Sequence, residues 1–343
     1  MYPEYTENAM SDEELNRNEA AQAAPESAPP PARKRRKKQK TSPLVLIVIL
    51  LLLLVIGYSG YRIFDKLLEY RKGQKAYNDL RNEVIQEAQA PPGTLATSEW
   101  NVPEVEPTAP PDETAGPDDP TNDPGHSRAA VGTDEMRGDI TYDPGDVTKF
   151  EPQVLPFWNI DFDRLRAINP DIKGWLYGMD GIVNYPVVQG SDNEYYSHRL
   201  LDRTERFCGT LFIDFRNHLL EDDVTYIFGH KMKDGSMFGH FGRYDTYAYY
   251  RTHPAFRLFL PDDIIYDLQV IACVYTTDRE SLRLNFQSQE DFDRTIADYR
   301  RRSTFRTEVD VQYGDKLVSM WTCAYYTEGG RMFIICKAVQ VVS

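Results

Sequence analysis

The sequence is poor in cysteine and in positive charge. Its 343 residues include four cysteines, at positions 208, 273, 323 and 336, and no two of them are separated by two residues. This count and spacing argue against a small disulfide-stapled protein and give no zinc-knuckle or dithiol redox motif. Lys and Arg number 39 against 53 Asp and Glu, for a formal net charge of −14. A general binder of nucleic-acid backbones would need a basic face instead.

Only one long apolar run is present, from Leu44 to Ile56, and a basic run, Arg33–Lys40, precedes it. Residues 43–64 are long enough to cross the hydrocarbon core as a helix. The basic run before this span predicts a cytoplasmic N-terminus, with residues 1–42 as a polar, disordered tail. The alternative is a cleaved signal peptide, but the long leader and the absence of an Ala-x-Ala site favour an uncleaved anchor.

Three further segments follow the predicted anchor. Residues 65–89 carry apolar side chains at mostly helical intervals among charges, which predicts a juxtamembrane helix that docks on the later domain. Residues 90–150 are rich in Pro, Asp and Glu and predict an extended, solvated spacer. Residues 151–343 are predicted to form the folded, extracellular domain.

The folded domain reads as mainly β with inserted helices. Asp161 is a predicted cap for a short helix through Ile168, which Pro170 stops. A second helix is predicted over Glu290–Arg301, because Phe292, Ile296 and Tyr299 share one face. Many short strands and few helices favour a β-barrel or sandwich. The predicted strands are Thr210–Ile213, Thr225–Phe228, Phe256–Leu260, Ile264–Tyr275, Lys316–Thr322 and Met332–Val342.

Three residues at predicted strand ends could carry acyl-transfer chemistry. Cys323 ends one strand, and Arg331 opens the next after a Gly-containing turn. If these strands pair, Cys323 and Arg331 face each other at one end of the sheet. His230 also lies just past a strand. A thiolate can attack a carbonyl, an imidazole can move protons, and a guanidinium can bind an oxyanion.

Each of these residues also has a structural interpretation. A free Cys in a β-rich domain is commonly a small buried apolar residue, which fits Cys273 and Cys336 in their apolar runs, while Cys208 is ambiguous. Arg331 by itself could be a surface strand residue. Composition and spacing alone do not decide between these readings.

Several ordered blocks resemble the class B sortases. Gly229–Phe238 is similar to that family's His-bearing motif, and Ser319–Cys323 is similar to its Thr-Leu-x-Thr-Cys signature, with Ser and Met replacing Thr and Leu. Arg331 stands where the family has its Arg. Two departures are the large Trp321 before Thr-Cys and the long acidic spacer. Further similar segments are Ile182–Gly190, Leu211–Asn217 and the helix at Glu290–Arg301, which matches the extra helix of class B.

The resemblance covers about residues 157–343 and implies a sortase-like closed β-barrel. It implies a cysteine transpeptidase in which Cys323, His230 and Arg331 are catalytic. It also suggests Thr322, Asn217 and Trp321 as substrate-binding residues. The expected substrates are secreted proteins with a C-terminal Asn-Pro-x-Thr-like sorting signal. The expected acceptor is an amine of peptidoglycan or of its lipid-linked precursor, in a Gram-positive-like cell wall. This chemistry requires no metal or organic cofactor, and no nucleic-acid partner is expected.

Three other functions remain open from the sequence. An extracellular thiol protease would use water as the acceptor, and a pilin-type subunit ligase would use the amine of another protein subunit. A non-catalytic surface-binding or assembly protein could use the same barrel, although it would have no reason to keep Cys323, His230 and Arg331 together.

Overall fold

The computed structural model describes residues 43–89, 102–103, 106–107, 155–276, 282–323 and 330–341. For Cys323 this description covers the strand pairing of its backbone. The predicted tail at 1–42 and most of the predicted spacer at 90–150 lie outside the described residues. The chain divides into two units, Met1–Ser59 and Gly60–Ser343.

Helix α2 (Pro43–Val84) contains the apolar run. The apolar residues of α2 from Leu44 to Ile56 are all exposed. A helix of this length and composition can cross a membrane. The sequence predicted the juxtamembrane helix through residue 89. The helix ends instead at Val84, because strand β1 (Ile85–Glu87) follows at once and pairs antiparallel with β2 (Trp158–Ile160).

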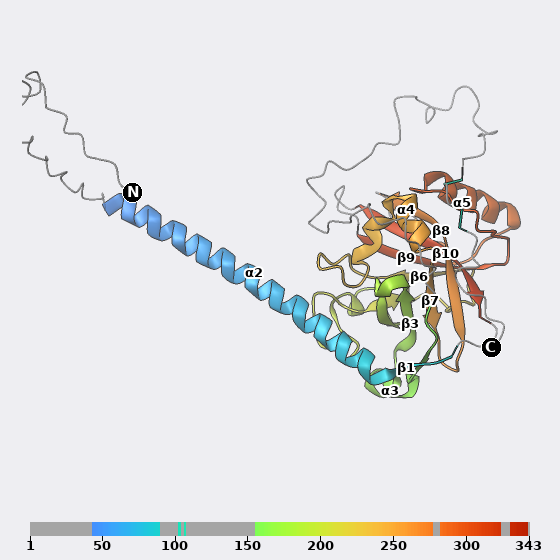
Figure 1. Cartoon of the computed structure of the whole chain (residues 1–343), viewed down its shortest axis with the longest axis horizontal. Helices are drawn as coiled ribbons and strands as arrows, with labels where there is room; N and C mark the ends of the chain where they lie inside the picture. Colours follow the sequence, from blue (N-terminus) through green and yellow to red (C-terminus); the bar gives the residue numbers. More distant parts are fainter. Residues whose placement is uncertain are drawn as a thin grey trace, which may run out of the picture. The chain divides into compact units, whose positions relative to one another are not determined.

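Eight strands of the second unit form a closed barrel in the order β10-β8-β7-β3-β4-β5-β6-β9 (Figure 1). Neighbouring strands are antiparallel except for two parallel pairs, β4–β5 and β6–β9. The closed barrel that the family resemblance implied is therefore confirmed. The strands are β3 (Ile172–Gly178), β4 (Asn184–Val188), β5 (Leu211–Ile213), β6 (Val224–Phe228), β7 (Ala255–Phe259), β8 (Ile265–Thr276), β9 (Lys316–Cys323) and β10 (Arg331–Gln340).

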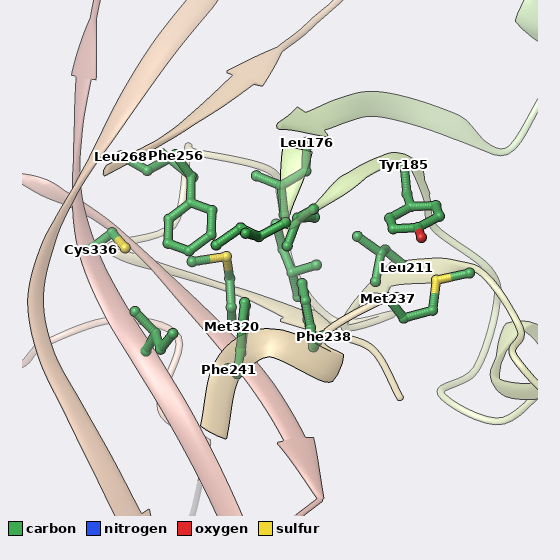
Figure 2. Close-up of a cluster of buried hydrophobic side chains, with 14 of the residues drawn as sticks. Leu176, Tyr185, Leu211, Met237, Phe238, Phe241, Phe256, Leu268, Met320 and Cys336 are labelled. Carbon is green, nitrogen blue, oxygen red and sulfur yellow. The ribbon is translucent and has the colours of Figure 1, made fainter. Parts of the chain in front are cut away.

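Alternating side chains of β9 belong to two different apolar clusters. On β9, Val318 and Met320 belong to the cluster inside the barrel. Met320 lies beside Phe238 and Phe241 there (Figure 2). Leu317 and Trp321 have the opposite parity and belong to a cluster on the outer face. Because side chains in a strand point to opposite faces in turn, parity assigns each position of β9 to one face.

Helices cover and close the barrel. Helix α5 (Gln289–Arg302) places Phe292 and Ile296 on the outer face of the sheet, beside Trp321. Its Ser288 cap accepts a hydrogen bond from the Asp291 N–H. Helix α3 (Phe162–Ile168) begins as predicted, since Asp161 accepts a bond from the Arg164 N–H at 2.8 Å. The remaining helical segments are η6 (Met179–Gly181), η7 (Tyr195–His198), η8 (Gly239–Asp245) and α4 (Tyr247–Thr252).

Two short pieces of the predicted spacer are described, residues 102–103 and 106–107, and they are half-buried rather than solvated. The Tyr247 hydroxyl donates to the Pro103 carbonyl at 2.6 Å, and the Arg306 N–H donates to Glu106 Oε1 at 3.0 Å. These pieces therefore lie against the barrel beside α4 and the segment that follows α5.

Candidate active site

The hairpin of β9 and β10 brings Cys323 and Arg331 together. The two strands are antiparallel, and their register pairs Arg331 with Cys323 and Phe333 with Trp321. Paired residues on adjacent strands have Cβ atoms roughly 4.5–5.5 Å apart. The predicted pairing of these two strands, with both positions at one end of the sheet, is confirmed.

Strand β6 brings His230 to the other side of β9. The two strands are parallel, with Phe228 opposite Trp321, and the Gly229 N–H donates to the Trp321 carbonyl at 3.1 Å. Position 230 follows Phe228 by two residues, and position 323 follows Trp321 by two. The register therefore places positions 323 and 331 directly opposite each other, and position 230 lies two residues past the last pair of β6 with β9.

The His230 ring is held by η7 and the loop between η7 and β5. Its Nε2 lies 2.7 Å from the Ser197 carbonyl oxygen. Because a carbonyl can only accept, Nε2 carries the hydrogen, and Nδ1 is the basic nitrogen of the neutral ring. The ring also lies nearly parallel to His198, with centroids 5.3 Å apart, and to Phe207, with centroids 5.7 Å apart.

The surroundings of His230 lower the pKa of its imidazole below the ordinary value. Burial is the main cause, because it disfavours the charged ring. The charge of His198 lowers the pKa further, whereas the hydrogen bond to the Ser197 carbonyl raises it. The net direction favours a neutral ring in the resting site.

The three predicted substrate-binding residues occupy different environments. Thr322 is buried with the parity of the barrel interior, and among the described residues its hydroxyl has no hydrogen-bond partner. Trp321 stacks on Phe333 at 4.5 Å between centroids, and its Nε1–H donates to Ser319 Oγ at 2.8 Å. Its indole is therefore packed in the cluster beneath α5.

Asn217 is 4 % exposed. Its Nδ2 donates to Asp222 Oδ2 at 3.0 Å and to the Val224 carbonyl at 2.8 Å. Its Oδ1 accepts from the Tyr226 N–H at 2.9 Å. These bonds tie the turn before β6 to the strand itself. Contact between Asn217 and substrate stays a prediction, and the observed bonds point to a structural role.

The other cysteines are buried thiols. Cys273 and Cys336 lie inside the barrel, and burial raises the pKa of both thiols. Burial likewise raises the pKa of Cys208 to about 11. A thiol held protonated is a poor nucleophile. The interpretation of Cys273 and Cys336 as core residues fits these surroundings.

The wall around His230 was not identified from the sequence. Ser197, His198 and Phe207 precede His230 by more than twenty positions and belong to no recognised motif. Ser197 contributes only a carbonyl oxygen, which every residue has. The local feature of the sequence that could have indicated this loop is Gly209, because a glycine often marks a tight turn. In the structure its φ is 60°.

Comparison with solved structures gives the class of the fold. The chain superimposes on the crystal structure of a Staphylococcus aureus sortase B–substrate complex with a TM-score of 0.50 and 30% identity. This match covers 53% of this chain and 85% of that one. A Clostridium perfringens sortase B structure shares the fold, with a TM-score of 0.50 at 23% identity over 52% of this chain and 100% of that one. The barrel is that of the sortases, enzymes with a cysteine nucleophile.

Curated sequences give the family. Sortase B of Staphylococcus aureus is 30% identical over 201 residues, which are 57% of this chain and 80% of that protein. Sortase B of Listeria monocytogenes is 33% identical over 180 residues, 51% of this chain and 72% of that protein. No protein-family model matches the chain. The chain belongs to the sortase B family of cysteine transpeptidases.

Proposed function

We propose that Cys323, His230 and Arg331 are the catalytic residues of this transpeptidase. The observation that carries the proposal is the register of three neighbouring segments, in which Arg331 pairs with Cys323 and β6 runs parallel to β9 up to Phe228, two residues before His230. A nucleophile, a proton-transfer group and an oxyanion partner must meet around one carbonyl carbon. The register supports such a meeting at one end of the barrel.

The reaction has two acyl-transfer steps. In the first, Cys323 gives its thiol proton to His230 and the resulting thiolate attacks the carbonyl carbon of the Thr in an Asn-Pro-x-Thr-like signal. The C–N bond that follows this Thr breaks, and His230 passes its proton to the leaving amine. In the second, an acceptor amine attacks the thioester carbonyl, His230 takes its proton, and the thiolate is released with a new amide. Arg331 holds the oxyanion in both steps, a donor contribution of about 2.7–4 kcal/mol.

The tautomer of His230 determines which ring nitrogen exchanges a proton with the leaving and incoming amines. Since Nε2 donates to the Ser197 carbonyl, Nδ1 is the nitrogen that gives and takes the proton. The lowered pKa of His230 makes its protonated form a stronger acid toward the leaving amine. General acid–base catalysis of this kind contributes on the order of 10²–10⁴-fold.

The substrates proposed are secreted proteins with a C-terminal sorting signal, joined to an amine of the cell wall. One solved sortase B structure is a complex with triglycine, a peptide whose N-terminus is a free amine, and another is a complex with substrate. Helix α2 would anchor the enzyme in the membrane, with the N-terminus in the cytoplasm and the barrel outside. Its long apolar stretch supports the anchoring, and the basic run at 33–40 supports the orientation.

The test compares Cys323→Ala with Cys273→Ala and Cys336→Ala. We expect Cys323→Ala to abolish both thioester trapping by mass spectrometry and product formation, while the two controls lose only stability. Full activity of Cys323→Ala would refute the proposal. Adding an amine to the cleavage assay separates transpeptidation from hydrolysis, because only a transpeptidase forms the amide product.

A further inference from the structure

The end of helix α2 lies against the loop that holds His230. Tyr77, in the last turns of α2, is 2 % exposed. Its hydroxyl lies 2.8 Å from the Gly209 carbonyl oxygen and 2.8 Å from Thr210 Oγ1. The Thr210 hydroxyl in turn donates to the Arg199 carbonyl at 2.7 Å. The hydroxyl of Tyr77 therefore joins the helix directly to the 209–210 arm of the loop and, through the Thr210 hydroxyl, to the other arm at Arg199.

The two arms of this loop also contact each other. The Thr210 N–H donates to the Tyr196 carbonyl at 3.0 Å. A Cβ atom at Gly209 would lie 2.4 Å from the Ser197 carbonyl oxygen, so only glycine permits this approach. The Ser197 carbonyl is the partner of His230, and Phe207 lies parallel to the His230 ring. A displacement of either arm would therefore move the wall of the ring.

The helix contacts two more points of the same region. A Cβ atom at Gly73 would lie 2.8 Å from Cys208 Sγ, so α2 approaches the loop closely there. Gln74 Nε2 donates to Asp234 Oδ2 at 2.9 Å, in the segment that follows His230. The exposed Gln74 bond adds little by itself, whereas Tyr77 is buried and its hydroxyl depends on its partners.

From these contacts we propose that Tyr77 is a positioning residue for His230. Its hydroxyl fixes the 196–210 loop, and that loop presents the Ser197 carbonyl to the His230 ring. This inference rests on the proposed catalytic role of His230. The helix that begins with the apolar run would thus also order the acid–base group of the barrel.

The test uses the full chain in detergent micelles with Tyr77→Phe, which keeps the ring and removes the hydroxyl. Tyr244→Phe is the matched control, because Tyr244 is also fully buried and also donates to a backbone carbonyl, that of His253, at 2.7 Å. We expect kcat of Tyr77→Phe to fall by about tenfold with KM unchanged, and kcat of Tyr244→Phe to stay within about twofold.

The second readout is the NMR titration of the His230 ring in the same proteins, with histidine-selective labelling. In Tyr77→Phe the loosened wall admits water, and relief of burial moves the His230 midpoint upward toward the ordinary value. A midpoint unchanged from wild type, or moved equally in Tyr244→Phe, would overturn the inference. Because the titration needs no turnover, it is independent of whether His230 is catalytic.

A pair of variants at the close approach guards against a fold defect in Tyr77→Phe. Gly73→Ala places a methyl group against Cys208 Sγ and should push α2 from the loop, which lowers kcat and moves the His230 midpoint. Gly73→Ala/Cys208→Ala removes the sulfur and should restore both. If His230→Gln loses activity while the His230 midpoint is the same in wild type and in Tyr77→Phe, the proposed function stands and only this inference is refuted.

Discussion

Replacement of Asn217 by Ala distinguishes a structural residue from a substrate contact. The Asn217 amide is 4 % exposed and makes three internal hydrogen bonds. Its removal leaves the Tyr226 N–H and the Val224 carbonyl without this partner, each at a cost of about 1–3 kcal/mol. Asp222 keeps its bond from the His218 N–H at 2.7 Å. The loss should therefore total about 3 kcal/mol.

A loss of this size is easily measured. For a domain of this size, about 1 kcal/mol shifts Tm by roughly 2–4 °C, so Asn217→Ala should lower Tm by about 6–12 °C. Asn285→Ala is the matched control, because Asn285 is exposed and donates to the same Asp222 carboxylate at 3.2 Å. Its Tm should fall by less than about 4 °C.

The assay combines scanning calorimetry with steady-state cleavage of a sorting-signal peptide well below Tm. We expect KM of Asn217→Ala to stay within about twofold of wild type, because the amide is occupied inside the protein. A Tm within a degree or so of wild type, together with a strongly raised KM, would show that Asn217 belongs to the substrate groove and that the structural reasoning is wrong.

Three other predictions concern single charges. Arg331→Lys should lower kcat/KM by about 10²–10³-fold at unchanged Tm, because an ammonium cannot reproduce the planar donor fork; near-normal turnover would remove Arg331 from the site. His198→Gln should raise the NMR midpoint of His230, since a like charge is lost. Because the pKa of His230 is lower in the folded protein, the unfolded chain binds the proton more tightly, and the free energy of unfolding should fall as pH drops below about 6.5. This loss of stability in acid should be smaller in His198→Gln. An unchanged His230 midpoint in that variant would contradict the coupling of the two rings. Asp267→Asn should lower the free energy of unfolding in urea by about 3–5 kcal/mol, because it leaves the buried Arg257 guanidinium without its carboxylate. That guanidinium donates to Asp267 Oδ1 at 2.6 Å and to Asp267 Oδ2 at 2.9 Å. A loss under about 1 kcal/mol would refute this.

Local signals in the sequence located the elements that depend on local chemistry. The cap at Asp161 and the apolar face at Phe292 and Ile296 predicted α3 and α5, because capping and helical periodicity are properties of neighbouring residues. Alternating and β-branched runs likewise located β5 to β10. The pairing of Cys323 with Arg331 followed from the short distance between the two strands in the sequence.

The barrel strands β3 and β4 were missed because their sequences contain residues that weaken strands, and the three-residue strands β1 and β2 were not predicted either. β3 contains Gly174, and β4 contains Pro186. A Cβ at position 174 would lie 2.8 Å from the Phe259 carbonyl oxygen, so the glycine allows a close approach to β7 that the sequence cannot reveal. The wall of His230 depends on a backbone carbonyl from a distant loop, and no side-chain pattern encodes such a contact.

The parallel pairing of β6 with β9 constrains which insertions and deletions this enzyme can tolerate. Between Phe228 and Trp321 lie more than ninety residues, including α4 and α5, and their length does not affect the level at which the two strands meet. Loss of a single residue within β9 would instead move position 323 to the opposite face of the sheet, and loss of two would draw it back by roughly 7 Å. Differences in length should therefore accumulate in the connections between strands, while the number of residues in β9 before position 323 stays fixed.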